Sequence, residues 1–227
     1  YNMTPDHERA KNIADNLLDK FKPENDHLIL RSFSKGFVSF PATLYWIGYD
    51  FLDTEHRSEN IDDKYRFARL IKSTKKLSDS LRFIVEQVMK SFVSKIDIEA
   101  VINVSLPLMA SITGKISFTT VTQLSLGKLL SDKFWSSLFS GALLGGMLSI
   151  GGEVSRAIYT SRDLRERNIT LYYTLKNKGD LDLLYFLVEK KLRPFEDACK
   201  LATTNKIQFD LVCRYFLEGI HENPDHS

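Results

Sequence analysis

The sequence predicts an all-α protein, a compact multi-helix bundle with a buried central apolar helical hairpin. Apolar residues recur at three- and four-residue spacing along most of the chain, and residues typical of helix N-caps precede several of these stretches. A run of 19 residues without a charge, 134–152, lies in the middle of the chain. No internal repeat or long Pro/Gly-rich linker interrupts the pattern, so we expect a single helical domain spanning 1–227.

The first predicted helix begins at Thr4, because Thr followed by Pro5 is typical of an N-cap and a first helical position. An apolar stripe continues from there to a predicted end near Lys22. The segment 27–52 is rich in aromatic residues and is interrupted by a glycine and a proline. Short helices are favoured there, and short strands are the alternative.

Asn60 predicts the cap of a helix that runs to about Lys75, with acidic residues in its first turn. The clearest amphipathic helix follows it. Its apolar positions are Leu77, Leu81, Ile84, Val85, Val88 and Phe92.

The C-terminal third also predicts helices. Residues 153–167 are strongly charged, and we expect an amphipathic helix after the apolar centre. A further helix is predicted to begin at Asp180 and to end at Pro194. Apolar residues within 207–216 predict a last helix, closed by Asn223 and a proline.

The two central arms of the hairpin are predicted at 100–127 and 134–152. As a helix the second arm is about 28 Å long, close to the ~30 Å hydrocarbon core of a bilayer. Four small residues four apart form one ridge, the small-xxx-small pattern that lets helices approach closely in lipid: Ser137, Gly141, Gly145 and Ser149. Large apolar residues cover another face: Phe139, Leu143, Met147 and Ile150. We expect both sets to take part in membrane insertion and helix packing.

The first arm is more polar and contains Pro107 and a single charge, Lys115. A charge at the centre of a membrane helix costs about 2.5–3.5 kcal/mol on insertion scales, so we expect Lys115 to face water and to form a polar lining. A short turn, 131–133, joins the two arms.

Basic residues follow the second arm, and they could rest on anionic headgroups at about 1 kcal/mol for each residue near the surface. The candidates for headgroup contact are Arg156, Arg162, Arg165 and Arg167. The alternative is an ordinary solvated helix face.

An apolar helical hairpin inside amphipathic helices, in a chain of this length, resembles the pore-forming domains of colicins and of related small antibacterial effectors. The resemblance is architectural and involves no residue motif. It implies a bundle that is soluble until its hairpin inserts into the inner membrane of a target cell, and a dedicated immunity protein as partner. About 75 residues follow the second arm, whereas colicin hairpins lie close to the C-terminus.

Composition and motifs argue against other classes. The chain has 43% hydrophobic and 26% charged residues, ordinary for a globular protein, and its net charge of +2 argues against a nucleic-acid binder. It contains no HExxH, zinc-type Cys/His spacing, Walker loop or GxSxG. Asp53 and Glu55 lie beside His56 and could form a hydrolytic or metal site in a turn, but an ordinary surface loop is the favoured interpretation. Cys199 and Cys213 are read as small buried residues, although a disulfide between them is geometrically possible.

We therefore expect no enzyme, cofactor or metal, and a function in membrane permeabilisation as a pore-forming antibacterial toxin or secreted effector. The expected partners are the lipid bilayer, an immunity protein, and further copies of the chain within the membrane. The first residues lack the apolar core of a signal peptide, so we expect synthesis in the cytoplasm and export by a specialised secretion system. The alternative is a non-catalytic soluble interaction module, an immunity or adaptor protein, whose hairpin is permanent core.

Overall fold

The computed structural model confirms the all-α class. It describes residues 3–20, 62–63, 65–67, 69–70, 77–104 and 153–222. Of these residues 89% are helical, and none of them forms a strand. The predicted hairpin lies outside the described residues beyond position 104, as does the segment 27–52.

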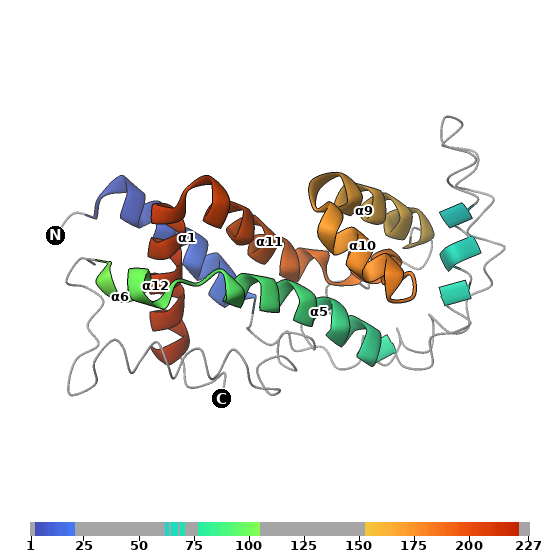
Figure 1. The fold of residues 1–227 in the computed structure, drawn as a ribbon, viewed down its shortest axis with the longest axis horizontal. Coiled ribbons are helices and arrows are strands. Elements are labelled where there is room, and N and C mark those ends of the chain that lie inside the picture. The colour runs from blue at the N-terminus through green and yellow to red at the C-terminus, as the bar shows by residue number, and fades with distance from the viewer. Residues whose placement is uncertain are drawn as a thin grey trace. The chain divides into compact units, whose positions relative to one another are not determined.

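The helices follow one another along the chain as Figure 1 shows. They are α1 (Pro5–Asp19), α5 (Leu77–Ser94), α6 (Ile98–Asn103), α9 (Glu153–Arg167), α10 (Ile169–Asn177), the 3-10 helix η2 (Leu181–Leu187), α11 (Glu189–Thr204) and α12 (Lys206–Glu222). The described residues between 62 and 70 are helical as well, within the helix predicted after Asn60.

The described residues belong to two compact units. Unit 1 holds α1, the end of α5, α6, nearly all of α11 and α12. Unit 2 holds the helical residues of 62–70, the first part of α5, α9, α10 and η2. The sequence predicts a single domain spanning 1–227. That prediction covers residues outside the described ranges as well, and it stays a prediction.

The start of α1 is as predicted. Thr4 is extended, and its hydroxyl oxygen accepts a hydrogen bond from the His7 backbone N–H at 3.4 Å, while Pro5 takes the first helical position. The helix ends at Asp19, slightly before the expected end near Lys22.

In unit 1, α1 packs closely against α12. Its buried face consists of Ala10, Ala14 and Leu17, which are fully enclosed. A Cβ atom placed on Gly219 of α12 would collide with the side chain of Leu18. The glycine therefore permits the close approach of the two helices.

Phe92 forms the centre of the unit 1 core. Its ring makes edge-to-face contacts with Phe195 at 5.4 Å, with Phe209 at 6.0 Å and with Phe216 at 5.4 Å between ring centroids. Such pairs contribute about 0.5–1.5 kcal/mol each beyond the area that they bury. The apolar face predicted for α5 is confirmed from Leu81 to Phe92, since all five of its positions in that range are buried.

In unit 2 a helix begins after Asp180, as predicted, but it is a short 3-10 helix. Residues 181–187 form a 3-10 helix in which every residue is buried. Asp180 has a left-handed backbone with φ of 59°, after Gly179 at φ of 122°. Its carboxylate accepts a hydrogen bond from Arg66 at 2.8 Å and makes no cap hydrogen bond to the helix that it precedes.

The prediction that this helix continues to Pro194 and ends there is wrong, because Pro194 lies inside α11. The α-helix begins only at Glu189, after η2, which makes Pro194 its sixth residue. A proline in a helix interior costs about 3 kcal/mol through its missing N–H and its ring. Burial of Leu192 and Phe195 on either side opposes that cost.

Candidate functional site

The residues predicted to insert into a membrane lie outside the described residues. They are Ser137, Phe139, Gly141, Leu143, Gly145, Met147, Ser149 and Ile150, together with Lys115 of the predicted polar lining. The structure does describe the helices on either side of this part of the chain. These are α6, which ends at Asn103, and α9, which begins at Glu153.

Two cations of α12 hold α6 at both of its ends. At its N-terminus the N-cap Asp97 accepts a hydrogen bond from Lys206 Nζ at 3.2 Å. At its C-terminus Arg214 Nη1 donates to the carbonyl oxygens of Val101 at 3.2 Å and of Ile102 at 2.9 Å. We call Lys206 and Arg214 the α6 clamp. Helices leave their last carbonyls without partners and favour positive charge there, so Arg214 satisfies both requirements.

The α6 clamp matters because α6 has only six residues. A helix this short is not stable alone in water. Backbone hydrogen bonding from Ala100 and the neighbouring Lys206 lower the pKa of Asp97 below its usual value. At Val104, with ψ of 126°, the backbone leaves the helical conformation.

In unit 2 a cluster of charged groups surrounds Arg66. Its guanidinium donates to both carboxylate oxygens of Asp182 at 2.9 Å, to Asp180 at 2.8 Å and to Asp63 at 3.2 Å. Ser161 of α9 donates its hydroxyl to Asp182 at 2.6 Å. These contacts tie the helical residues of 62–70 to α9 and to η2.

Asp182 is completely buried, so its charge depends on these partners. Burial by itself lowers the pKa of Arg66, but the hydrogen bonds and charges of Asp182, Asp180 and Asp63 outweigh burial and raise it above its ordinary value. The arginine therefore stays charged at every pH at which the protein is folded. Removing one member of the cluster would leave a buried charge without its partner.

Sequence reasoning did not identify this cluster. One signal was present: Asp182 is an acid inside the apolar run LDLLYFL, and such a residue implies a buried partner. The identity of that partner was not predictable, because Arg66 is 116 residues away in the chain.

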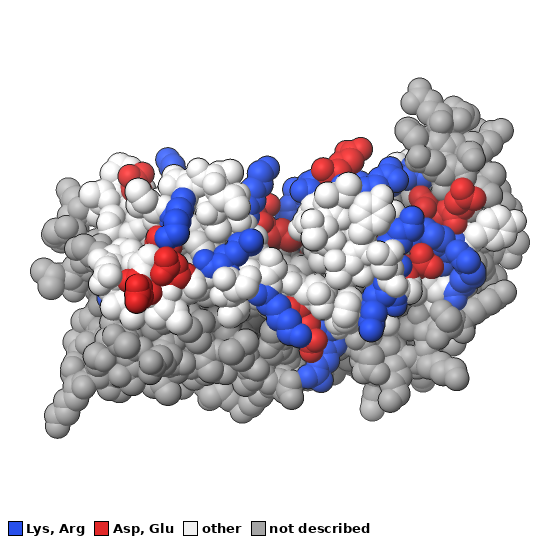
Figure 2. All heavy atoms as spheres, in the orientation of Figure 1, with Lys and Arg blue, Asp and Glu red and all other residues white. Residues whose placement is uncertain are grey.

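The four arginines predicted to contact headgroups lie on α9, and Figure 2 shows basic side chains gathered over the α9 and α10 part of unit 2. Arg162 bonds to Asp63 at 3.2 Å with 14% of its side chain exposed, and Arg167 bonds to Asp163 at 2.6 Å with 18% exposed. The guanidinium groups of Arg156 and Arg165 lie over the aromatic rings of Phe186 and Tyr172. Headgroup contact stays a prediction for all four.

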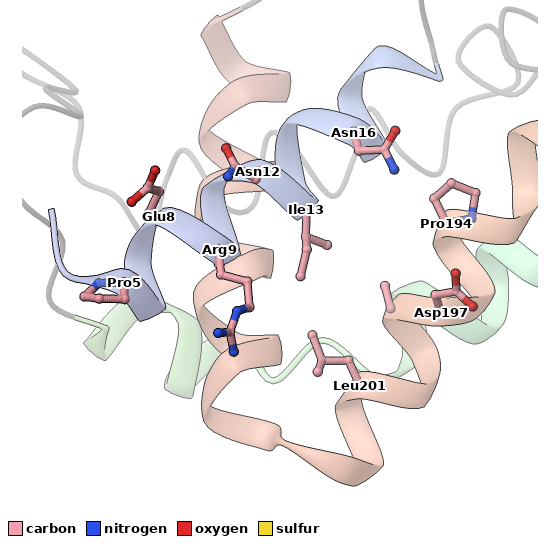
Figure 3. A pocket seen from close by; sticks show the side chains of 10 residues that line it. Pro5, Glu8, Arg9, Asn12, Ile13, Asn16, Pro194, Asp197 and Leu201 are labelled. Atoms are coloured by element: carbon pink, nitrogen blue, oxygen red, sulfur yellow. The ribbon is translucent and has the colours of Figure 1, made fainter.

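An open groove of about 630 Å³ lies between α1 and α11 in unit 1. Figure 3 shows Ile13 and Leu201 pointing into this space. The lining residues are Pro5, Glu8, Arg9, Asn12, Ile13, Asn16, Pro194, Asp197, Ala198 and Leu201. Among the described residues that line the groove, none is a serine, cysteine or histidine, and its charged side chains are Glu8, Arg9 and Asp197.

Within the described ranges, no three His, Cys, Asp or Glu side chains gather in a way that could hold a metal ion. The two cysteines are free thiols, Cys213 buried and Cys199 half-buried, with Cys199 Sγ 3.9 Å from the hydroxyl of Ser91. Burial raises the pKa of both thiols.

Among the helices that the structure describes, none combines the length and the apolar character needed to cross a bilayer. Comparison of the chain with protein-family models, with curated proteins and with solved structures gave no match.

Proposed function

We propose that this chain is a membrane-permeabilising, pore-forming antibacterial effector that stays soluble until its apolar arms insert. One observation carries the proposal: the uncharged run 134–152 places Ser137, Gly141, Gly145 and Ser149 four residues apart. Glycine costs a soluble helix about 0.8–1 kcal/mol relative to alanine, yet it is frequent in membrane helices, where it permits close packing.

In the proposed mechanism the arms exchange the bundle for lipid while the two helical units remain folded. The α6 clamp supports this division because it ties the start of the first arm, up to Asn103, to unit 1, so that the part of the arm that inserts lies beyond Val104. The Arg66 cluster likewise ties α9, which follows the second arm, to unit 2. The small-residue ridge packs helix against helix, and Lys115 with the polar residues of the first arm faces the water-filled path. An ion path requires such a lining. An immunity protein as partner follows from the resemblance to colicin-type proteins alone.

The test measures dye release and loss of membrane potential in vesicles that contain anionic lipid. The wild-type chain is expected to permeabilise them, and Gly141→Leu or Gly145→Leu is expected to reduce the activity, because a large side chain on the ridge separates the packed helices. Ala142→Leu is the matched control, since it adds a large side chain next to the ridge.

The alternative, a soluble interaction module, predicts a different outcome. Vesicles would stay intact at micromolar protein, and the two glycine substitutions would chiefly lower the melting temperature by overpacking a permanent core. An absence of leakage at every pH and lipid charge tested would refute the pore-forming proposal.

A further inference from the structure

The exposed side of α10 carries apolar side chains at neighbouring positions of one helix face. Two large apolar side chains four residues apart lie exposed there: Ile169 at 57% and Tyr173 at 47%. Residues at this spacing share one helix face. Thr170 and Thr174 are exposed beside them, and the Thr174 hydroxyl donates to the Thr170 carbonyl at 2.8 Å. That hydroxyl therefore already has a partner when water is removed from the surface.

Cations stand beside this apolar pair. Tyr172, whose ring is largely buried, lies under two of them: Arg165 at 5.9 Å and the Lys176 ammonium at 5.7 Å from its ring centre. The ring of Tyr172 also contacts the ring of Tyr173, with centroids 5.1 Å apart. Such contacts hold Arg165 and Lys176 next to the exposed tyrosine.

The charge in this region is mainly positive. The sequence of α10 contains no acidic residue, and Lys178 follows directly as its C-cap. On the neighbouring turn of α9, Glu166 is exposed, whereas Asp163 is paired with Arg167. Figure 2 shows an uncharged surface over α10 with basic side chains around it.

An exposed apolar and aromatic pair bordered by Lys and Arg is the composition of surfaces that lie at a membrane interface. We propose that the α10 face, defined as Arg165, Ile169, Tyr173 and Lys176, docks on a bilayer surface that contains anionic lipid. The aliphatic and aromatic side chains enter the headgroup region, and the two cations meet lipid phosphates. Docking deepens the proposed function by assigning the first contact with the target membrane to unit 2, apart from the arms.

The α10 face also allows contact with lipid without Arg162 and Arg167 of α9. These two arginines are bonded to Asp63 and Asp163, and moving them to lipid would break those pairs. Arg165 and Lys176 can meet a lipid phosphate while they remain over the Tyr172 ring. Docking on this face therefore leaves the internal ion pairs of unit 2 intact.

The experiment measures partition of the full chain onto phosphatidylcholine vesicles with and without phosphatidylglycerol, by flotation at low and high ionic strength. Wild type is expected to bind the anionic vesicles more tightly and to lose binding as salt rises. The double variant Ile169→Asp/Tyr173→Asp is expected to bind about tenfold more weakly or worse. Lys176→Gln is expected to bind about fivefold more weakly.

Ile207→Asp is the matched control, because Ile207 is 78% exposed on α12 in unit 1 and lies outside the α10 face. Circular dichroism and melting temperature check that each variant folds. Wild-type affinity in both α10-face variants would overturn the inference, as would a wild-type chain that does not bind anionic vesicles.

Dye release measured in parallel separates this inference from the proposed function. Tight, α10-dependent binding without leakage supports the docking face and refutes pore formation. Leakage at the wild-type level with unchanged binding in the α10-face variants overturns the docking face and leaves pore formation standing.

Discussion

Replacing Arg66 with alanine is expected to cost unit 2 about 3–5 kcal/mol, the range measured when one partner of a buried ion pair is removed. Asp182 is fully buried and receives two of its hydrogen bonds from Arg66, so the variant leaves it with the Ser161 hydroxyl. Asp180 and Asp63 lose their bonds to the same guanidinium.

Urea denaturation followed by circular dichroism measures this effect. With slopes of about 1–3 kcal/mol per molar urea, the midpoint of the unit 2 transition is expected to fall by more than about 1 M. Hydrogen exchange of η2 and α9 assigns the loss to unit 2. Arg82→Ala is the matched control, because Arg82 pairs with Glu86 on α5 with 48% of its side chain exposed and is expected to cost at most about 0.5 kcal/mol.

The double variant Arg66→Met/Asp182→Leu is expected to recover most of the loss, because an apolar pair of similar size removes the unpaired buried charge. If Arg66→Ala were no more costly than Arg82→Ala, Asp182 would be solvated in solution, and the account of a buried cluster would be refuted.

Three further predictions concern unit 1. Gly219→Val is expected to cost about 1 kcal/mol in urea denaturation, because the half-buried Leu18 side chain must move to another rotamer, and a variant more stable than wild type would contradict this collision. The lowered pKa of Asp97 gives a contribution to stability that is present above the ordinary carboxylate value of about 3.9 and is lost as pH falls through the lowered pKa. Asp97→Asn should therefore remove part of the acid dependence of the melting temperature. Because burial raises the pKa of both thiols, iodoacetamide at mildly alkaline pH should modify Cys199 more slowly than a free thiol, and Cys213 only in denaturant; rapid native labelling of Cys213 would contradict its burial.

The elements that the sequence predicts well are those whose signals are local. Thr4 and Pro5 mark the start of α1, and the apolar spacing up to Phe92 marks α5, because a cap and an amphipathic stripe depend on residues within a few turns. Predictions fail where residues far apart in the sequence determine the local structure. The helix predicted from Asp180 to Pro194 forms as η2 followed by α11, and the position of Pro194 within α11 depends on where η2 ends.

The candidate site shows the same limit. The basic residues of α9 are evident in the sequence. The pairing of Arg162 with Asp63 is not evident there, because the two positions are 99 residues apart. The exposure of Ile169 and Tyr173 depends on which side of α10 packs on α9 and η2, and one sequence does not fix that choice.

The α6 clamp has a mechanical consequence. A six-residue helix would unravel under tension on the chain beyond Val104, but Arg214 grips its last turn and Lys206 its first. Tension at that point is therefore passed to α12, whose inner side is anchored by Phe209 and Phe216.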